Sequence, residues 1–68
     1  MTTIQAAAEQ YVREARQAGV ILKLAEPDEG YWEDVRAADW SAYERARVSA
    51  NLAGVRGQHV AAILRGED

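Results

Sequence analysis

The chain has 68 residues, no cysteine and a net charge of −3. A chain of this size forms one domain, residues 1–68, and buries only about 60% of its unfolded surface. Without cysteine it has neither disulfides nor thiolate metal ligands to reinforce a small core, which suits a reducing compartment. Its longest uncharged apolar run is far shorter than the ~20 residues that a membrane span needs, and the N-terminus lacks the features of a signal peptide. We therefore expect a cytoplasmic domain with no membrane partner.

Charge is divided unevenly along the chain. Residues 45–66 contain four arginines and no acid. Residues 26–39 contain one base, Arg36, and six acids: Glu26, Asp28, Glu29, Glu33, Asp34 and Asp39. This pattern is typical of solvated faces that keep a small protein soluble, and also of a surface that steers an oppositely charged partner.

The first predicted element is a helix that begins near Thr3 and ends at Gly19. Thr2 and Gln5 have the spacing of a capping box, and apolar residues then recur at helical spacing as far as Ala15. Gly19 is suited to the left-handed conformation that often ends a helix.

A hairpin is predicted next. The segment VILKL (20–24) changes to a period of two, which predicts a strand, and YWEDVR (31–36) predicts the strand that returns after the turn-forming AEPDEG. An alternative stays open, because Asp28 could cap a short helix that begins at Glu29. In the strand, one face carries Val20, Leu22 and Leu24, and the other carries Ile21 and Lys23.

Two helices complete the chain. Ser41 and Glu44 form a second capping box, which predicts a helix as far as about Ala53. Gly54 and Gly57 each cost about 1 kcal/mol relative to alanine inside a helix, so we expect a break between them. A short last helix ends at Gly66. The predicted class is α+β, with the order helix, β-hairpin, helix, helix (αββαα).

Large apolar residues are few, and we expect most of them to be buried. Trp40 and Tyr43 are assigned to the core because alanine fills much of the rest. Tyr31 and Trp32 are adjacent in a strand, so one of them faces outward and is a candidate contact residue. The predicted core consists of Ile4, Tyr11, Val12, Val20, Leu22, Leu24, Val35, Trp40, Tyr43, Val48, Leu52, Val55, Val60, Ile63 and Leu64.

Residues for catalysis or metal binding are scarce. His59 is the only histidine, and Ser49 is the only serine without a predicted capping role that could pair with it. One histidine without cysteine provides too few transition-metal ligands, and EPDEG lacks the register of a calcium loop. Glu33 and Asp34 point to opposite faces of a strand, which does not suit paired acid/base carboxylates. We expect no enzymatic activity, no catalytic residue, no cofactor and no metal ion.

The stretch AGVRGQHVAAI resembles the signature of KH-type RNA-binding domains, in which a GxxG loop between two helices clamps phosphates. The resemblance implies that Arg56 contacts phosphate. A helix boundary marked by two glycines explains the same residues. The nucleic-acid interpretation involves Arg45, Arg47, Gly54, Arg56, Gly57 and His59.

A second resemblance covers more of the chain. The order of elements, the junction ARQAGVILKL and the ending VRGQHVAAIL are similar to the small N-terminal docking domains of tubulysin-type peptide/polyketide synthetases. The resemblance implies that the hairpin edge receives a short linear motif from another subunit by strand addition and charge pairing. The residues that it places against this peptide are Ile21, Lys23, Tyr31, Glu33 and Asp34.

In size and charge the chain is also similar to compact acidic inhibitors from phages and other mobile elements, such as anti-CRISPR proteins. From Met1 to the final RGED it reads as a complete small reading frame. By this analogy, the acidic stretch 26–39 imitates a phosphate backbone and blocks a basic surface.

The sequence thus predicts a non-enzymatic module that binds a larger, basic protein partner through an acidic hairpin. Nucleic-acid binding through GVRG is the alternative, and a homodimer is a further option. The predicted partner-binding residues are Ile21, Lys23, Asp28, Glu29, Tyr31, Trp32, Glu33, Asp34 and Asp39.

Overall fold

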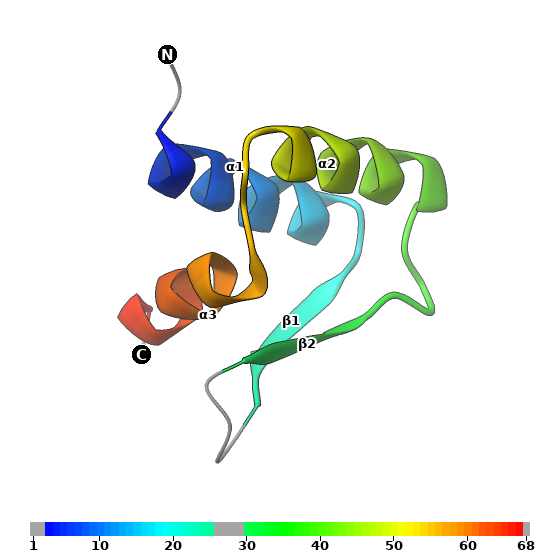
Figure 1. The fold of residues 1–68 in the computed structure, drawn as a ribbon. Helices are drawn as coiled ribbons and strands as arrows, with labels where there is room; N and C mark the ends of the chain where they lie inside the picture. The colour runs from blue at the N-terminus through cyan, green and yellow to red at the C-terminus, as the bar shows by residue number, and fades with distance from the viewer. Residues whose placement is uncertain (1–2, 26–29, 68) are drawn as a thin grey trace.

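The computed structural model describes residues 3–25 and 30–67, which form helices and one antiparallel hairpin (Figure 1). The elements are α1 (Ile4–Gln17), β1 (Ile21–Leu24), β2 (Tyr31–Asp34), α2 (Trp40–Leu52) and α3 (Gly57–Gly66). The predicted α+β class and the αββαα order are confirmed. β2 is a strand and not a helix, which resolves the alternative left open by the sequence.

Helix α1 lies at the centre of the arrangement. It packs against α2 on one side and against β1 and α3 on another. In Figure 1, α1 and α2 run side by side in opposite directions, with the hairpin and α3 below them. In the described part of the chain, α2 approaches no helix or strand other than α1 at the level of the backbone. Any further link from α2 to the hairpin must therefore come from side chains.

Small residues allow α1 to pack closely against its neighbours. Its buried residues are Ala7, Ala8, Tyr11, Val12 and Ala15, and α2 contributes Tyr43, Ala46 and Ala50. Alanines on both helices let the two backbones approach closely, and Tyr11 and Tyr43 are the large side chains buried with them. Val20, Leu22, Val55, Val60 and Leu64 complete the apolar core from the other elements.

The junction between α1 and β1 follows the sequence prediction. Gly19 has a φ of +95°, and a Cβ at this position would lie 3.3 Å from the carbonyl oxygen of Ala37. Both the left-handed backbone and the close neighbour favour glycine.

At the start of α1, Thr3 is the N-cap, and its hydroxyl accepts a hydrogen bond from the Ala6 N–H at 3.0 Å. Thr2, the predicted capping residue, lies outside the described residues.

The start of α2 differs from the prediction. Asp39 and not Ser41 is the N-cap, since its carboxylate accepts from the Ala42 N–H at 3.2 Å and the helix begins at Trp40. The backbone N–H of Asp39 also donates to the carbonyl of Ala18 at the end of α1, at 2.6 Å. This long-range bond holds the chain at Asp39 and places the helix start there.

Four residues predicted for the core are exposed instead: Ile4 (43%), Trp40 (58%), Val48 (52%) and Leu52 (85%). Three of them belong to α2. The face that α2 turns to α1 is the one with Tyr43, Ala46 and Ala50, so the apolar residues on its other side lie in solvent. The prediction that Tyr43 is buried is confirmed, with 5% of the residue exposed.

Candidate functional site

Strand pairing decides which way each hairpin residue faces. Leu22 pairs with Glu33, and Lys23 pairs with Trp32. Since side chains alternate along a strand, Tyr31 and Glu33 share the inner face with Leu22 and Leu24. The other face, here called the hairpin outer face, consists of Ile21, Lys23, Trp32 and Asp34.

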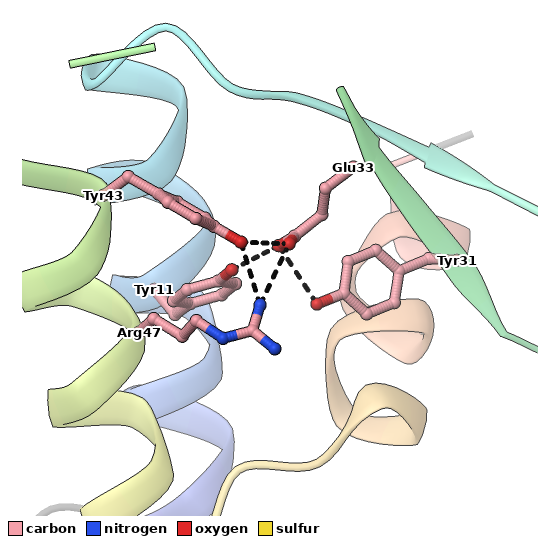
Figure 2. A network of polar contacts seen from close by, with 5 residues as sticks. All are labelled: Tyr11, Tyr31, Glu33, Tyr43 and Arg47. Atoms are coloured by element: carbon pink, nitrogen blue, oxygen red, sulfur yellow. Dashed lines mark hydrogen bonds and ion pairs between the residues drawn. The ribbon is translucent and has the colours of Figure 1, made fainter. Parts of the chain in front are cut away.

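The inner face brings Glu33 to a cluster of hydroxyl groups (Figure 2). Tyr11 of α1 donates a hydrogen bond to Oε2 of Glu33, and Tyr31 donates to the same oxygen at 3.2 Å. Tyr43 of α2 donates to Oε1 at 2.6 Å. Nη1 of Arg47 donates to the Tyr43 hydroxyl at 2.8 Å and to Oε1 of Glu33 at 3.3 Å. We call these five residues the tyrosine–glutamate network; they include all three tyrosines of the chain.

The network joins elements whose backbones do not meet. Glu33 belongs to β2, whereas Tyr43 and Arg47 belong to α2, whose backbone approaches α1 and no other described helix or strand. Only 12% of the Glu33 side chain is exposed, so this carboxylate depends on protein donors in place of water. Figure 2 shows the ring and guanidinium groups converging on it from separate elements. The network therefore positions α2 relative to the hairpin.

The surroundings raise the pKa of every tyrosine in the network. Desolvation by burial is the largest cause in each case, and the proximity of the Glu33 carboxylate adds to it. For Tyr31 the pKa rises to about 12. The hydroxyl groups thus stay protonated at neutral pH, which is the form that donates to Glu33.

A cavity of about 250 Å³ lies next to the network, between α2 and the start of α3. Its polar lining comes from Tyr11, Tyr31, Arg47, Asn51 and Arg56, and Gly57 forms part of the wall. Nη1 of Arg56 also donates to the carbonyl oxygen of Val55 at 3.3 Å. Two guanidinium groups at one cavity are an arrangement that favours an anion.

The hairpin outer face combines apolar and charged groups. Ile21 is 52% exposed and Trp32 is 46% exposed. The Lys23 ammonium lies 5.5 Å from the centroid of the Trp32 ring, a cation–π distance. Asp34 forms an ion pair with Arg36 at 2.8 Å. Hydrogen bonds from Arg36 lower the pKa of Asp34 to about 2.

The structure separates the predicted partner-binding residues into three groups. Ile21, Lys23, Trp32 and Asp34 lie together on the hairpin outer face. Tyr31 and Glu33, which the docking-domain resemblance places against a peptide, turn inward because strand alternation puts them beside Leu22. Asp39 caps α2. Asp28 and Glu29 lie outside the described residues.

The predicted nucleic-acid set is also divided. Arg47, Arg56 and Gly57 line the cavity. Gly54 lies in the connection between α2 and α3, with a φ of +88°. His59 is occupied as a cap, because its Nδ1 accepts from the backbone N–H of Arg56 at 2.8 Å. Arg45 is exposed on the outer side of α2.

The sequence alone does not single out Tyr11, Tyr43 or Asn51 as site residues. Tyr11 and Tyr43 do carry a usable signal, because both are predicted for the core and a buried phenol hydroxyl needs a hydrogen-bond partner. Glu33, on the inner face of its strand, is the acceptor that these two hydroxyl groups use. No comparable sequence signal marks Asn51.

Among residues 3–25 and 30–67, no three His, Cys, Asp or Glu side chains gather in a way that could hold a metal ion. In the same ranges, no helix has the length and apolar character needed to cross a membrane.

We expect Glu33→Ala to lower the free energy of unfolding by about 2–3 kcal/mol, because it leaves partly buried hydroxyl groups without their acceptor. Urea denaturation followed by far-ultraviolet circular dichroism measures the change. Glu33→Gln, which keeps one acceptor oxygen, should lose less.

The control for this experiment is Asp34→Ala, which removes the neighbouring carboxylate from the same strand. Its ion pair with Arg36 is on the surface, and such pairs contribute little to stability. An equal loss of stability in the Glu33 and Asp34 variants would contradict a structural role of the network.

We also expect the fold to be lost in alkali. Because the tyrosine pKa values are higher in the folded chain than the value near 10 of an unfolded chain, their contribution is complete below about pH 10. It declines as the pH rises toward the folded-state value, which for Tyr31 is about 12. Tyrosinate absorbance and circular dichroism should therefore change together in this range. Ionisation near pH 10 with the fold intact, as for the same chain in urea, would contradict the network.

Comparisons of the chain with protein-family models, with curated proteins and with solved structures give no match. The likenesses to docking domains, KH domains and small acidic inhibitors therefore stay predictions.

Proposed function

We propose that the chain is a non-catalytic protein-binding module of the cytoplasm and that the hairpin outer face receives a segment of a larger protein. The observation that carries this proposal is the exposure of Ile21 and Trp32 on one face of the hairpin, at 52% and 46%. Diagonal neighbours on paired strands lie close enough for one partner side chain to contact both. Tryptophan is a frequent anchor of protein interfaces.

The form of the sheet supports an extended partner segment. Among residues 3–25 and 30–67 the sheet has two strands, so within these residues each strand keeps one edge without a strand partner. The N–H of Ala25 donates to the carbonyl of Gly30 at 3.1 Å, so these two residues form a hydrogen-bonded pair. Along an antiparallel sheet such pairs alternate with pairs that are not hydrogen-bonded to each other. By that alternation, the backbone groups of Leu22 and Leu24 point away from β2, and those of Tyr31 and Glu33 point away from β1. Strand addition uses such groups for affinity and side-chain contacts for specificity.

The charge of the partner follows from the acids of the hairpin segment. Glu26, Asp28 and Glu29 lie between the two strands in the sequence, and the whole chain carries a net charge of −3. A basic partner segment would complement them. Glu33 is not part of the proposed contact because its carboxylate is held in the network, and Asp39 is not part of it because it caps α2.

The test compares two matched substitutions, Ile21→Glu on the hairpin outer face and Ile4→Glu on α1. Ile4 is the first residue of its helix and is 43% exposed, so glutamate is tolerated there. With nuclease-treated lysate of the native host, we expect one protein to be captured by the wild type and by Ile4→Glu. Binding of that purified protein to Ile21→Glu should be at least about tenfold weaker, the effect of an interface anchor.

Equal affinity of the two variants for the captured protein would exclude the hairpin outer face. The strength of binding should also fall with salt if the acids take part. Asp34→Asn is the suitable charge variant, since it leaves the network intact.

A second candidate function is nucleic-acid binding at the cavity. Arg47, Asn51 and Arg56 meet there, and Arg56 has no ion-pair partner among the described residues. A phosphate group would find two guanidinium groups and the N-terminal end of α3 at one place. Glu33 makes phosphate binding at this cavity less favourable, because its carboxylate already forms an ion pair with Arg47.

Gly57→Asp separates the two candidates. A Cβ at Gly57 would meet Tyr31 at 3.7 Å, an ordinary contact, and aspartate suits the first residue of a helix. The fold should therefore survive, while the new charge should abolish binding of a labelled single-stranded RNA in fluorescence anisotropy. Protein capture by the hairpin should be unaffected. Gly66→Asp, with open space around its Cβ, adds the same charge at the far end of α3 as a control. Equal RNA affinity of Gly57→Asp and the wild type would exclude the cavity.

A further inference from the structure

Helix α2 has a face that no other described element covers. Its buried residues lie on the side of α1, and α2 packs against no other helix or strand in the described part of the chain. In Figure 1, α2 lies at the edge of the fold with α1 beside it. On its outer side, Trp40, Val48 and Leu52 are 58%, 52% and 85% exposed.

These apolar residues are arranged as a ridge. Residues four apart in a helix form a continuous row, and here the row is Trp40, Glu44, Val48 and Leu52. The next row has small residues at two of its three helical positions and consists of Ser41, Arg45 and Ser49. Between the rows lies an open hollow lined by Ser41, Glu44, Arg45, Val48 and Ser49. A ridge of large side chains therefore runs beside a groove that could receive the same ridge from another molecule.

Charge selects the occupant of this groove. Glu44 and Arg45 are adjacent in the two rows, and neither has an ion-pair partner within the described residues. If a second α2 lies antiparallel, with the two-fold axis between residues 44 and 45, Glu44 of each copy faces Arg45 of the other. The same register sets Val48 opposite the small Ser41. A parallel arrangement would oppose Glu44 to Glu44, which is unfavourable.

We propose that a second copy of this chain docks on the α2 outer face, defined as Trp40, Ser41, Glu44, Arg45, Val48, Ser49 and Leu52, with the two α2 helices antiparallel. Such a contact is self-complementary, as an interface on a two-fold axis requires. It also adds apolar burial to a chain whose own core is small. The face shares no residue with the hairpin outer face, which lies on β1 and β2.

Sedimentation over a series of concentrations tests the proposal. We expect the wild type to form a dimer and Leu52→Glu to raise its dissociation constant at least tenfold, since glutamate would enter an apolar contact. Leu52 is 85% exposed in the single chain, so the substitution leaves the fold intact, which circular dichroism verifies. Ile4→Glu, which adds the same charge at a 43% exposed isoleucine of α1, should leave the dimer unaffected. A wild type that remains monomeric throughout the series would overturn the proposal.

The register is tested by charge reversal. Glu44→Arg puts arginines against arginines across the antiparallel contact, and Arg45→Glu puts glutamates against glutamates, so each variant alone should be mainly monomeric. An equimolar mixture restores opposite charges at every contact and should form a heterodimer. If the mixture stays monomeric while the wild type is dimeric, the antiparallel register is wrong. If Leu52→Glu dimerises as the wild type does, the α2 outer face is not the interface.

Discussion

The carboxylate of Glu33 is the group on which the arrangement of this domain depends. It is largely withdrawn from solvent, and a carboxylate in that position is tolerated only where protein donors replace water. The donors come from three elements: Tyr11 from α1, Tyr31 from β2, and Tyr43 and Arg47 from α2. In the described residues α2 and the hairpin make no backbone contact with each other, so they are joined by their shared packing on α1 and by the hydrogen bonds to this one side chain.

The two proposed binding surfaces follow from this inner constraint. With Glu33 directed inward, strand alternation turns Trp32 outward, and antiparallel pairing brings Lys23 beside it. With Tyr43 held by Glu33, α2 presents its alanines to α1 and leaves Val48 and Leu52 in solvent. The partly buried polar cluster and the packing of alanines against α1 thus act together in leaving these apolar residues exposed.

Many residues of the candidate site were predictable from the sequence, but the partners that their side chains contact were not. Alternation in VILKL predicted that Ile21 and Lys23 share a face, and both do lie on the hairpin outer face. The acids at 33, 34 and 39 looked alike in the sequence. In the structure one is held by tyrosines, one by Arg36 and one by the first turn of α2. Glu33 is bonded to tyrosines 22 and 10 residues away in the sequence, whereas Asp34 and Asp39 are bonded to residues close to them in the chain. Sequence spacing does not distinguish such cases.

The sequence by itself determined the order of the elements, the hairpin, and the helix ends at Gly19 and Gly54, because these follow from local periodicity and from backbone conformations that favour glycine. Only the tertiary structure decided that α2 begins after Asp39, where the backbone N–H of Asp39 donates to the carbonyl of Ala18, the C-cap residue of α1. The tertiary structure also decided the exposure of Trp40, Val48 and Leu52. Helix α2 has apolar residues on more than one side, and the side that is buried is the one whose alanines pack closely against α1.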